Sequence, residues 1–282
     1  MTGMTTPLRE RTNVLGVGVS PVNLPLALRT IDRWIAEGER QYVCITGVHG
    51  VMESQADDEL RRIHNGAGMV TPDGMPLVWL SHLAGQREVD RVYGPDLMLA
   101  LCERSVVRRY RHFLYGGGEG VPELLAQKLQ ERFPGLEVVG TYSPPFRPLT
   151  PEEDQEITDM IDASGADIVW VGLSTPKQER WMAAHVGRLR APVLIGVGAA
   201  FDFHAGLKKQ APRWVQRSGF EWLFRMLTEP KRLARRYLTN NPKFVRLALE
   251  QQLGLKKYSL ADTQTIQTNG TRQANVQERG TA

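Results

Sequence analysis

The chain has 282 residues, which is enough for one or two domains with a core of ordinary size. Its hydrophobic content of 41% and charged content of 23% are typical of a soluble globular protein, and its most apolar stretch, residues 192–201, is far too short to span a bilayer. The formal net charge of +4 is unevenly placed, because residues 213–257 carry 11 Lys or Arg against 3 Glu. That segment therefore holds +8, which leaves the rest of the chain near −4.

Two features bear on the cellular compartment. Cys44 and Cys102 each lie in an apolar run, which favours buried, reduced thiols in a reducing compartment. The N-terminal residues contain no apolar stretch of the kind that signal peptides carry. We therefore expect a cytoplasmic protein that is either soluble or attached to a membrane from one side.

Predicted strands and helices alternate along the chain after a polar segment over residues 1–12. Strands are expected over residues 14–19, 42–46, 68–71, 112–115, 136–140, 167–172 and 193–197. Helices are expected over residues 24–37, 52–64, 75–83, 96–108, 122–132, 152–163 and 176–186. Such alternation through short glycine turns is typical of an α/β fold with a mainly parallel sheet.

The composition divides the chain into three parts. We expect an α/β core over residues 1–210 and a basic helical appendage over residues 211–254. Residues 255–282 are polar and poor in apolar side chains, which predicts a disordered tail.

A turn motif, residues 71–74 (TPDG), follows one expected strand and precedes an apolar helical run. Asp73 thus lies where a strand turns into a helix, and Arg91 precedes the next such turn, residues 93–95 (YGP). An acid and a fixed cation near the carboxyl edge of a sheet are parts that an active site uses. The alternative is that Asp73 only forms the turn or caps the following helix.

A second motif, residues 174–179 (STPKQE), carries the signals of a helix start. Thr175 is expected as the N-cap, Pro176 at the first helical position, and Gln178 as the partner in a capping box. The free N–H groups of such a helix start suit an anion. Capping explains Thr175 and Pro176 but not Lys177, whose charge is unfavourable there, so Lys177 is a candidate anion ligand.

Other signals are weaker. The glycines at 116–118 follow a strand, so the backbone at Gly117 could approach a phosphate, but Val121 breaks the dinucleotide fingerprint. Asp202 follows the last strand and is either a site residue or a turn carboxylate. The chain has no Asp-x-Asp pair and no two histidines four residues apart, so we expect no metal site. Arg and Lys would then neutralise any bound diphosphate.

Six ordered motifs resemble the WecG/TagA/CpsF glycosyltransferases, bacterial enzymes that add a sugar to a lipid-linked acceptor. The resemblance covers residues 14–244, and its motifs are TPDGMPLVW, RVYGPDLM, STPKQERW, GVGAAFDFHAG, APRW and GFEWLFRMLTEPKRLARRYL. It implies a Rossmann-like core and an inverting transfer from a UDP-sugar to a polyprenyl-diphosphate-linked sugar. It also implies that neither a metal nor a cofactor takes part.

The resemblance also implies roles for individual residues. Asp73 matches the family's general base, and Thr46 and Arg91 match two further active-site positions. Gln178 matches the glutamine of the family's PKQE motif. The C-terminal arginines that are thought to meet the diphosphate match Arg225, Arg232 and Arg235.

Two departures from the family pattern bear on which sugars are used. Val48 stands where the family usually has Asn, two residues after Thr46. Gln210 stands where the family has the Arg of its Arg-Ala-Pro sequence.

Two other functions fit parts of the sequence. The alternating strands and glycine turns also suit a nicotinamide-dependent oxidoreductase, although a full fingerprint is missing. The +8 segment also suits a non-catalytic module that binds a membrane or nucleic acid, but that leaves Asp73 and the PKQE stretch unexplained.

The basic segment is predicted to be a lid that faces a membrane. Aromatic and basic residues alternate through residues 213–253, and together they suit an anionic lipid surface. If the helical path continued across Pro230, Arg225, Arg232 and Arg235 would share one face. We expect an enzyme at the inner face of the cell membrane with no nucleic-acid partner, and the sequence leaves an oligomer open.

Overall fold

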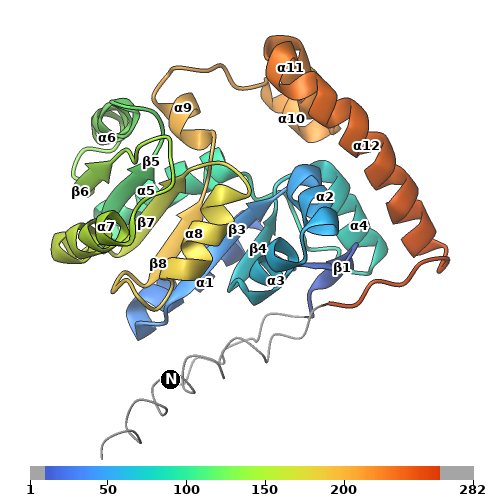
Figure 1. Cartoon of the computed structure of the whole chain (residues 1–282), viewed down its shortest axis with the longest axis horizontal. Helices are drawn as coiled ribbons and strands as arrows, with labels where there is room; N and C mark the ends of the chain where they lie inside the picture. The colour runs from blue at the N-terminus through green and yellow to red at the C-terminus, as the bar shows by residue number, and fades with distance from the viewer. Residues whose placement is uncertain (1–9, 261–282) are drawn as a thin grey trace, which may run out of the picture.

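The computed structural model describes residues 10–260 (Figure 1). Its centre is a parallel six-stranded sheet with the strand order β4-β3-β8-β7-β5-β6. This confirms the predicted α/β fold with a Rossmann-like parallel sheet. The strands are β3 (Gln41–Thr46), β4 (Met69–Pro72), β5 (Arg111–Gly116), β6 (Glu137–Tyr142), β7 (Ile168–Gly172) and β8 (Val193–Gly196).

Helices cover both faces of the sheet, so its central strands are apolar on both sides. In β7, Val169 and Val171 belong to one buried cluster, and Ile168 and Trp170 belong to the other. The helices of the core are α1 (Leu24–Glu37), α2 (Val48–Ala56), α3 (Asp58–Gly66), α4 (Met75–Leu83), α5 (Gly94–Arg108), α6 (Val121–Arg132), α7 (Pro151–Ser164), α8 (Lys177–His185) and α9 (Ala200–His204).

Local signals explain where several helices begin and end. Asn23 caps α1 by accepting the Leu26 N–H at 3.0 Å, and α1 ends at Gly38, whose φ of 68° suits glycine. Thr150 and Glu153 form a reciprocal capping box at the start of α7.

Two predicted elements prove to be divided. The strand expected over residues 14–19 is a hairpin of β1 (Thr12–Val14) and β2 (Val17–Val19). Leu15 and Gly16 form its turn, both with positive φ, as a tight two-residue hairpin requires. The helix expected over residues 52–64 is likewise two helices, α2 and α3. They separate at Asp57, whose carboxylate caps α3 by accepting the Leu60 N–H at 2.9 Å.

Three further helices, α10 (Arg213–Ser218), α11 (Glu221–Thr228) and α12 (Pro230–Gln252), follow the sheet. The chain breaks at Glu229 between α11 and α12, so the helical path is not continuous across Pro230. Figure 1 shows α12 running past α2 toward the β1 hairpin.

The C-terminal half of α12 packs against the core. Phe244, Leu247 and Ala248 are buried in the same cluster as the β1–β2 hairpin. Gln251 donates to the Asn13 carbonyl and accepts the Leu15 N–H, each at 2.9 Å. The division of the chain at residues 210 and 211 stays a prediction, but α12 is firmly attached to the core.

Residues 255–260, placed in the predicted tail, lie along the hairpin. The carbonyl of Tyr258 accepts the Asn13 side-chain amide at 2.6 Å, and the Tyr258 ring packs against the core. The remainder of the predicted tail, residues 261–282, and residues 1–9 lie outside the described residues.

Candidate active site

A cavity of about 700 Å³ opens at the carboxyl ends of β3, β4 and β8. This is the edge at which parallel α/β sheets bind ligands. The core supplies its floor through the turns that follow β3, β4, β7 and β8. Helices α10, α11 and α12 cover it. Its polar lining includes His49, Asp73, Thr175, Gln178, Arg225 and Arg236.

Asp73 lies in the floor of the cavity, directly after β4. Its backbone N–H donates to the Thr46 carbonyl at 3.0 Å, so neighbouring strands fix its position. Its carboxylate Oδ1 is buried and 3.7 Å from Nη2 of Arg91, while the side chain as a whole is 31% exposed. Burial raises the pKa of Asp73 to about 6, Arg91 opposes that rise, and Glu221 adds to it.

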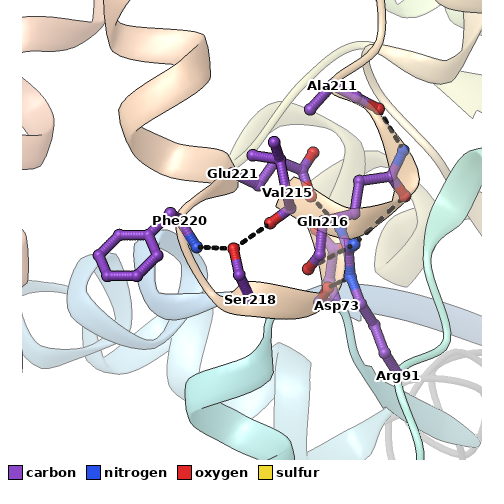
Figure 2. A network of polar contacts seen from close by, with 8 residues as sticks. All are labelled: Asp73, Arg91, Ala211, Val215, Gln216, Ser218, Phe220 and Glu221. Carbon is purple, nitrogen blue, oxygen red and sulfur yellow. Dashed lines mark hydrogen bonds and ion pairs between the residues drawn. The ribbon is translucent and has the colours of Figure 1, made fainter.

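Arg91 joins the core to the covering helices. Its guanidinium donates to the Asp73 carbonyl, to both oxygens of Gln216 at 3.4 Å, and to the Glu221 carboxylate. Figure 2 shows this network, in which Gln216 also donates to the Ala211 carbonyl at 2.8 Å. Because its donors are engaged by protein, Arg91 acts through the groups that it positions.

The arginines of the covering helices differ from one another. Arg225 on α11 and Arg236 on α12 both line the cavity. Neither forms an ion pair with the side chains that the structure describes, and the Nε atom of each is buried without a hydrogen-bond partner. Arg235 is exposed and outside the cavity lining. Arg232 lies on α12, but its side chain is outside the described part of the structure.

The start of α8 differs from the predicted capping box. The helix begins at Lys177 with Pro176 as N-cap and no side-chain cap. Thr175 instead donates to Glu179 at 2.8 Å, and Gln178 donates to the same carboxylate oxygen at 3.1 Å. The capping-box prediction is wrong because the buried Glu179 attracts both side chains. Thr175 and Gln178 still line the cavity.

Thr46 lies at the carboxyl end of β3 and is 2% exposed. Its hydroxyl is buried and makes no hydrogen bond among the described residues. The side chain lies beneath the start of α2, because a Cβ on Gly50 would come within 3.0 Å of it. Thr46 thus supports the cavity floor from below.

Like Thr46 and Arg235, three further predicted site residues lie outside the cavity lining. The Lys177 ammonium is 4.8 Å from the centre of the Phe146 ring. Asp202 pairs with Lys208 at 2.7 Å. The Gly117 N–H donates to the Gly172 carbonyl at 3.0 Å, so this turn serves the contact between β5 and β7.

The cavity also contains residues that the sequence did not single out. Glu221 and Gln216 could not be recognised, because their partner Arg91 is more than 100 residues away in the chain. Arg236 is not among the arginines that match the family's C-terminal positions, so the resemblance did not single it out. His49 belongs to no motif, and only its position shortly after β3 and Gly47 could have marked it.

The fold and this cavity suit a glycosyltransferase. The sequence profile of the glycosyl transferase WecG/TagA/CpsF family matches residues 12–258, and the chain belongs to that family. This confirms the resemblance and sets aside both the oxidoreductase and the non-catalytic module.

Curated relatives share most of their length with the chain. An N-acetylglucosaminyldiphosphoundecaprenol N-acetyl-beta-D-mannosaminyltransferase of Bacillus spizizenii is 30% identical over 200 residues, which cover 71% of this chain and 75% of the relative. The enzyme of the same name from Staphylococcus aureus strain MRSA252 is 29% identical over 193 residues, which cover 68% of this chain and 73% of the relative.

Proposed function

We propose that this glycosyltransferase moves a sugar from a UDP-sugar donor to a hydroxyl of a polyprenyl-diphosphate-linked sugar, with inversion at the anomeric carbon. The observation that carries the proposal is one cavity that combines an acid of raised pKa, an apolar wall and two arginines that form no ion pair with the described side chains. The relatives' names support the acceptor class and suggest an N-acetylhexosamine as the transferred group.

Asp73 is the general base in this proposal. The acceptor hydroxyl attacks the anomeric carbon, the carboxylate takes its proton, and the bond from that carbon to UDP breaks. A pKa of about 6 leaves Asp73 mostly ionised at neutral pH yet more basic than an ordinary aspartate. Arg91 positions Asp73 by contacting its carboxylate and its carbonyl. Thr46 positions Asp73 because the Thr46 carbonyl accepts the backbone N–H of Asp73.

The two substrates occupy different parts of the cavity. The donor lies against the turn between β7 and α8, where Thr175 and Gln178 line the wall. The acceptor's diphosphate lies below Arg225 and Arg236, since arginine forms strong, directional hydrogen bonds to phosphate oxygens. With these cations in place the reaction needs no metal ion. No group of three His, Cys, Asp or Glu side chains suited to a metal occurs between residues 10 and 260.

The apolar wall suits the lipid part of the acceptor. Trp79 and Leu83 of α4 and Val245 and Leu249 of α12 line the cavity and are also exposed at its rim. A polyprenyl chain leaving the diphosphate would meet these side chains and lose contact with water.

The covering helices would also contact the membrane that holds this lipid. Trp214, Phe220, Leu227 and Leu238 are exposed on α10 to α12, close in sequence to exposed basic residues. No helix within residues 10–260 is long and apolar enough to cross a bilayer. We place the enzyme at the inner face of the cell membrane.

A transfer assay tests the proposal. The full chain is incubated with a panel of UDP-sugars and polyprenyl-diphosphate-linked N-acetylglucosamine, and products are identified by mass. We expect UDP release and a lipid-linked disaccharide with at least one donor. Nucleotide-sugar consumption that is independent of the acceptor would contradict the proposal.

A further inference from the structure

His49 lies in the first turn of α2, and its side chain lines the cavity. Its Nδ1 atom is buried and lies 3.5 Å from the Glu53 carboxylate, one turn further along the helix. This contact is no hydrogen bond, so neither ring nitrogen has a hydrogen-bond partner among the described residues, and Nδ1 is the buried one. The N-cap, Gly47, has no side chain, so the cavity reaches the start of the helix beside His49.

Positive charges on two other helices disfavour protonation of this imidazole. Arg225 on α11 and Arg236 on α12 exert the largest electrostatic effects on it. Helix α12 packs against α2, past which it runs in Figure 1. Burial, then the charges of Arg236 and Arg225, lower the pKa of His49 to about 4. The half-exposed Glu53 does not offset them, so the free enzyme holds a neutral imidazole at neutral pH.

The acidic side chains that line the same cavity lie beside Arg91. Glu221 is paired with Arg91, and Asp73 lies 3.7 Å from the same guanidinium. Tyr237 is the other titratable side chain of α12 in the lining. The cavity therefore presents two arginines and one histidine to a ligand from three helices, and the complementary ligand is an anion with more than one charge.

We propose that His49 is a third ligand of the acceptor's diphosphate, beside Arg225 and Arg236, and that it takes up one proton from solvent when the diphosphate binds. The inference rests on the proposed function, because it assigns the occupant of that site. No covalent bond changes in this step. The imidazolium then donates its Nε2–H to a phosphate oxygen as a charge-assisted hydrogen bond.

The physical cause is the cancellation of charge. A bound diphosphate neutralises the arginines that hold His49 unprotonated, and its own negative charge favours the imidazolium. A diphosphate esterified at both ends has no proton that titrates near neutral pH, so uptake would come from the protein. Because binding takes up a proton, affinity rises as pH falls, by up to about tenfold per pH unit between the free and bound pKa of His49.

Calorimetry tests the inference in an Asp73→Asn background, which removes the other group that titrates in this range and prevents turnover. The probe is farnesyl-diphosphate-linked N-acetylglucosamine, titrated at about pH 6 in two buffers with different ionisation enthalpies. We expect uptake of about one proton in the Asp73→Asn protein and close to none in Asp73→Asn with His49→Gln. His82→Gln, on α4 outside the cavity lining, is the matched control and should retain the uptake.

Affinity separates a ligand role from a structural one. With His49→Gln the probe should bind about tenfold more weakly near pH 6 and with nearly unchanged affinity at alkaline pH. His49→Asn is the second variant, and unchanged UDP binding and thermal unfolding verify the fold of both. Equal proton uptake with and without His49 would overturn the inference and leave the proposed function intact. Failure of the probe to bind any of the proteins would contradict both.

Discussion

Glu221 competes with Asp73 for the same cation. The Arg91 guanidinium contacts the Glu221 carboxylate closely, whereas it lies 3.7 Å from Oδ1 of Asp73. Burial is the main reason that the pKa of Asp73 reaches about 6, and the charge of Glu221 raises it further. The covering helix α11, which carries Glu221, therefore helps to set the basicity of Asp73, the proposed general base.

Replacing Glu221 should shift the pH dependence of transfer. Asp73 works as a base only when deprotonated, so the rate should fall as pH drops through about 6. The Glu221→Gln substitution removes a negative charge, so the pKa of Asp73 should fall. The acid limb of the pH profile of kcat should then move to lower pH by roughly half a unit or more. Glu250→Gln, at the far end of α12, is the control, and an unmoved limb in Glu221→Gln would contradict the coupling.

A second prediction separates two neighbouring arginines. Arg236 lines the cavity and Arg235 is exposed outside it, although the family resemblance points to Arg235. With a soluble acceptor analogue, Arg236→Ala should raise KM for the acceptor about tenfold or more, because a desolvated contact to phosphate is lost. Arg235→Ala should change it little. The reverse order would show that the register of α12 differs in the working enzyme.

Site residues that lie next to turns could be recognised from the sequence. Asp73 and Gln178 both follow a predicted strand and both line the cavity. Lys177 could not be placed from sequence, because its direction depends on Phe146 from a distant loop. Gln216 and Glu221 were missed because their role exists only once α10 and α11 lie against Arg91.

Helices α10 to α12 cover the cavity and also carry exposed apolar side chains. Trp214 on α10 and Leu238 on α12 are 75% and 64% exposed. Arg213, Lys231 and Arg235 lie near them in sequence and are exposed as well. Each Lys or Arg near an anionic lipid surface contributes about 1 kcal/mol of attraction.

Charge reversal on these helices should therefore release the protein from lipid. The triple variant Arg213→Glu, Lys231→Glu and Arg235→Glu should bind anionic vesicles at least about tenfold more weakly in a sedimentation assay. Wild-type binding should also weaken at high salt. Arg29→Glu on α1 is a control exposed elsewhere in the core. Equal binding by the triple variant would show that the membrane contact lies on another face.

The order and type of most elements could be predicted, because apolar runs and glycine turns mark buried parallel strands. The hairpin at β1 and β2 was merged into one strand, since the need for positive φ at Leu15 is not visible in a non-glycine residue. The packing of α12 on the core could not be predicted either. It depends on Gln251 meeting Asn13 across almost the whole chain.

For the whole molecule, the proposed reaction requires the protein's own cations to replace a metal ion. Arg225 and Arg236 supply positive charge where the diphosphate is proposed to lie. Transfer should therefore continue at an undiminished rate in excess EDTA. Activity that disappears with EDTA and returns with added Mg²⁺ or Mn²⁺ would contradict this requirement.

As the proposed general base, Asp73 removes the acceptor's proton within this cavity. A direct test compares the transfer rate of the full chain with that of Asp73→Asn, using the same UDP-sugar and lipid-linked acceptor and following UDP release. We expect a kcat about 10²–10⁴-fold lower in Asp73→Asn, with UDP affinity and thermal unfolding little changed. An Asp73→Asn enzyme that transfers sugar at the wild-type rate would contradict this role.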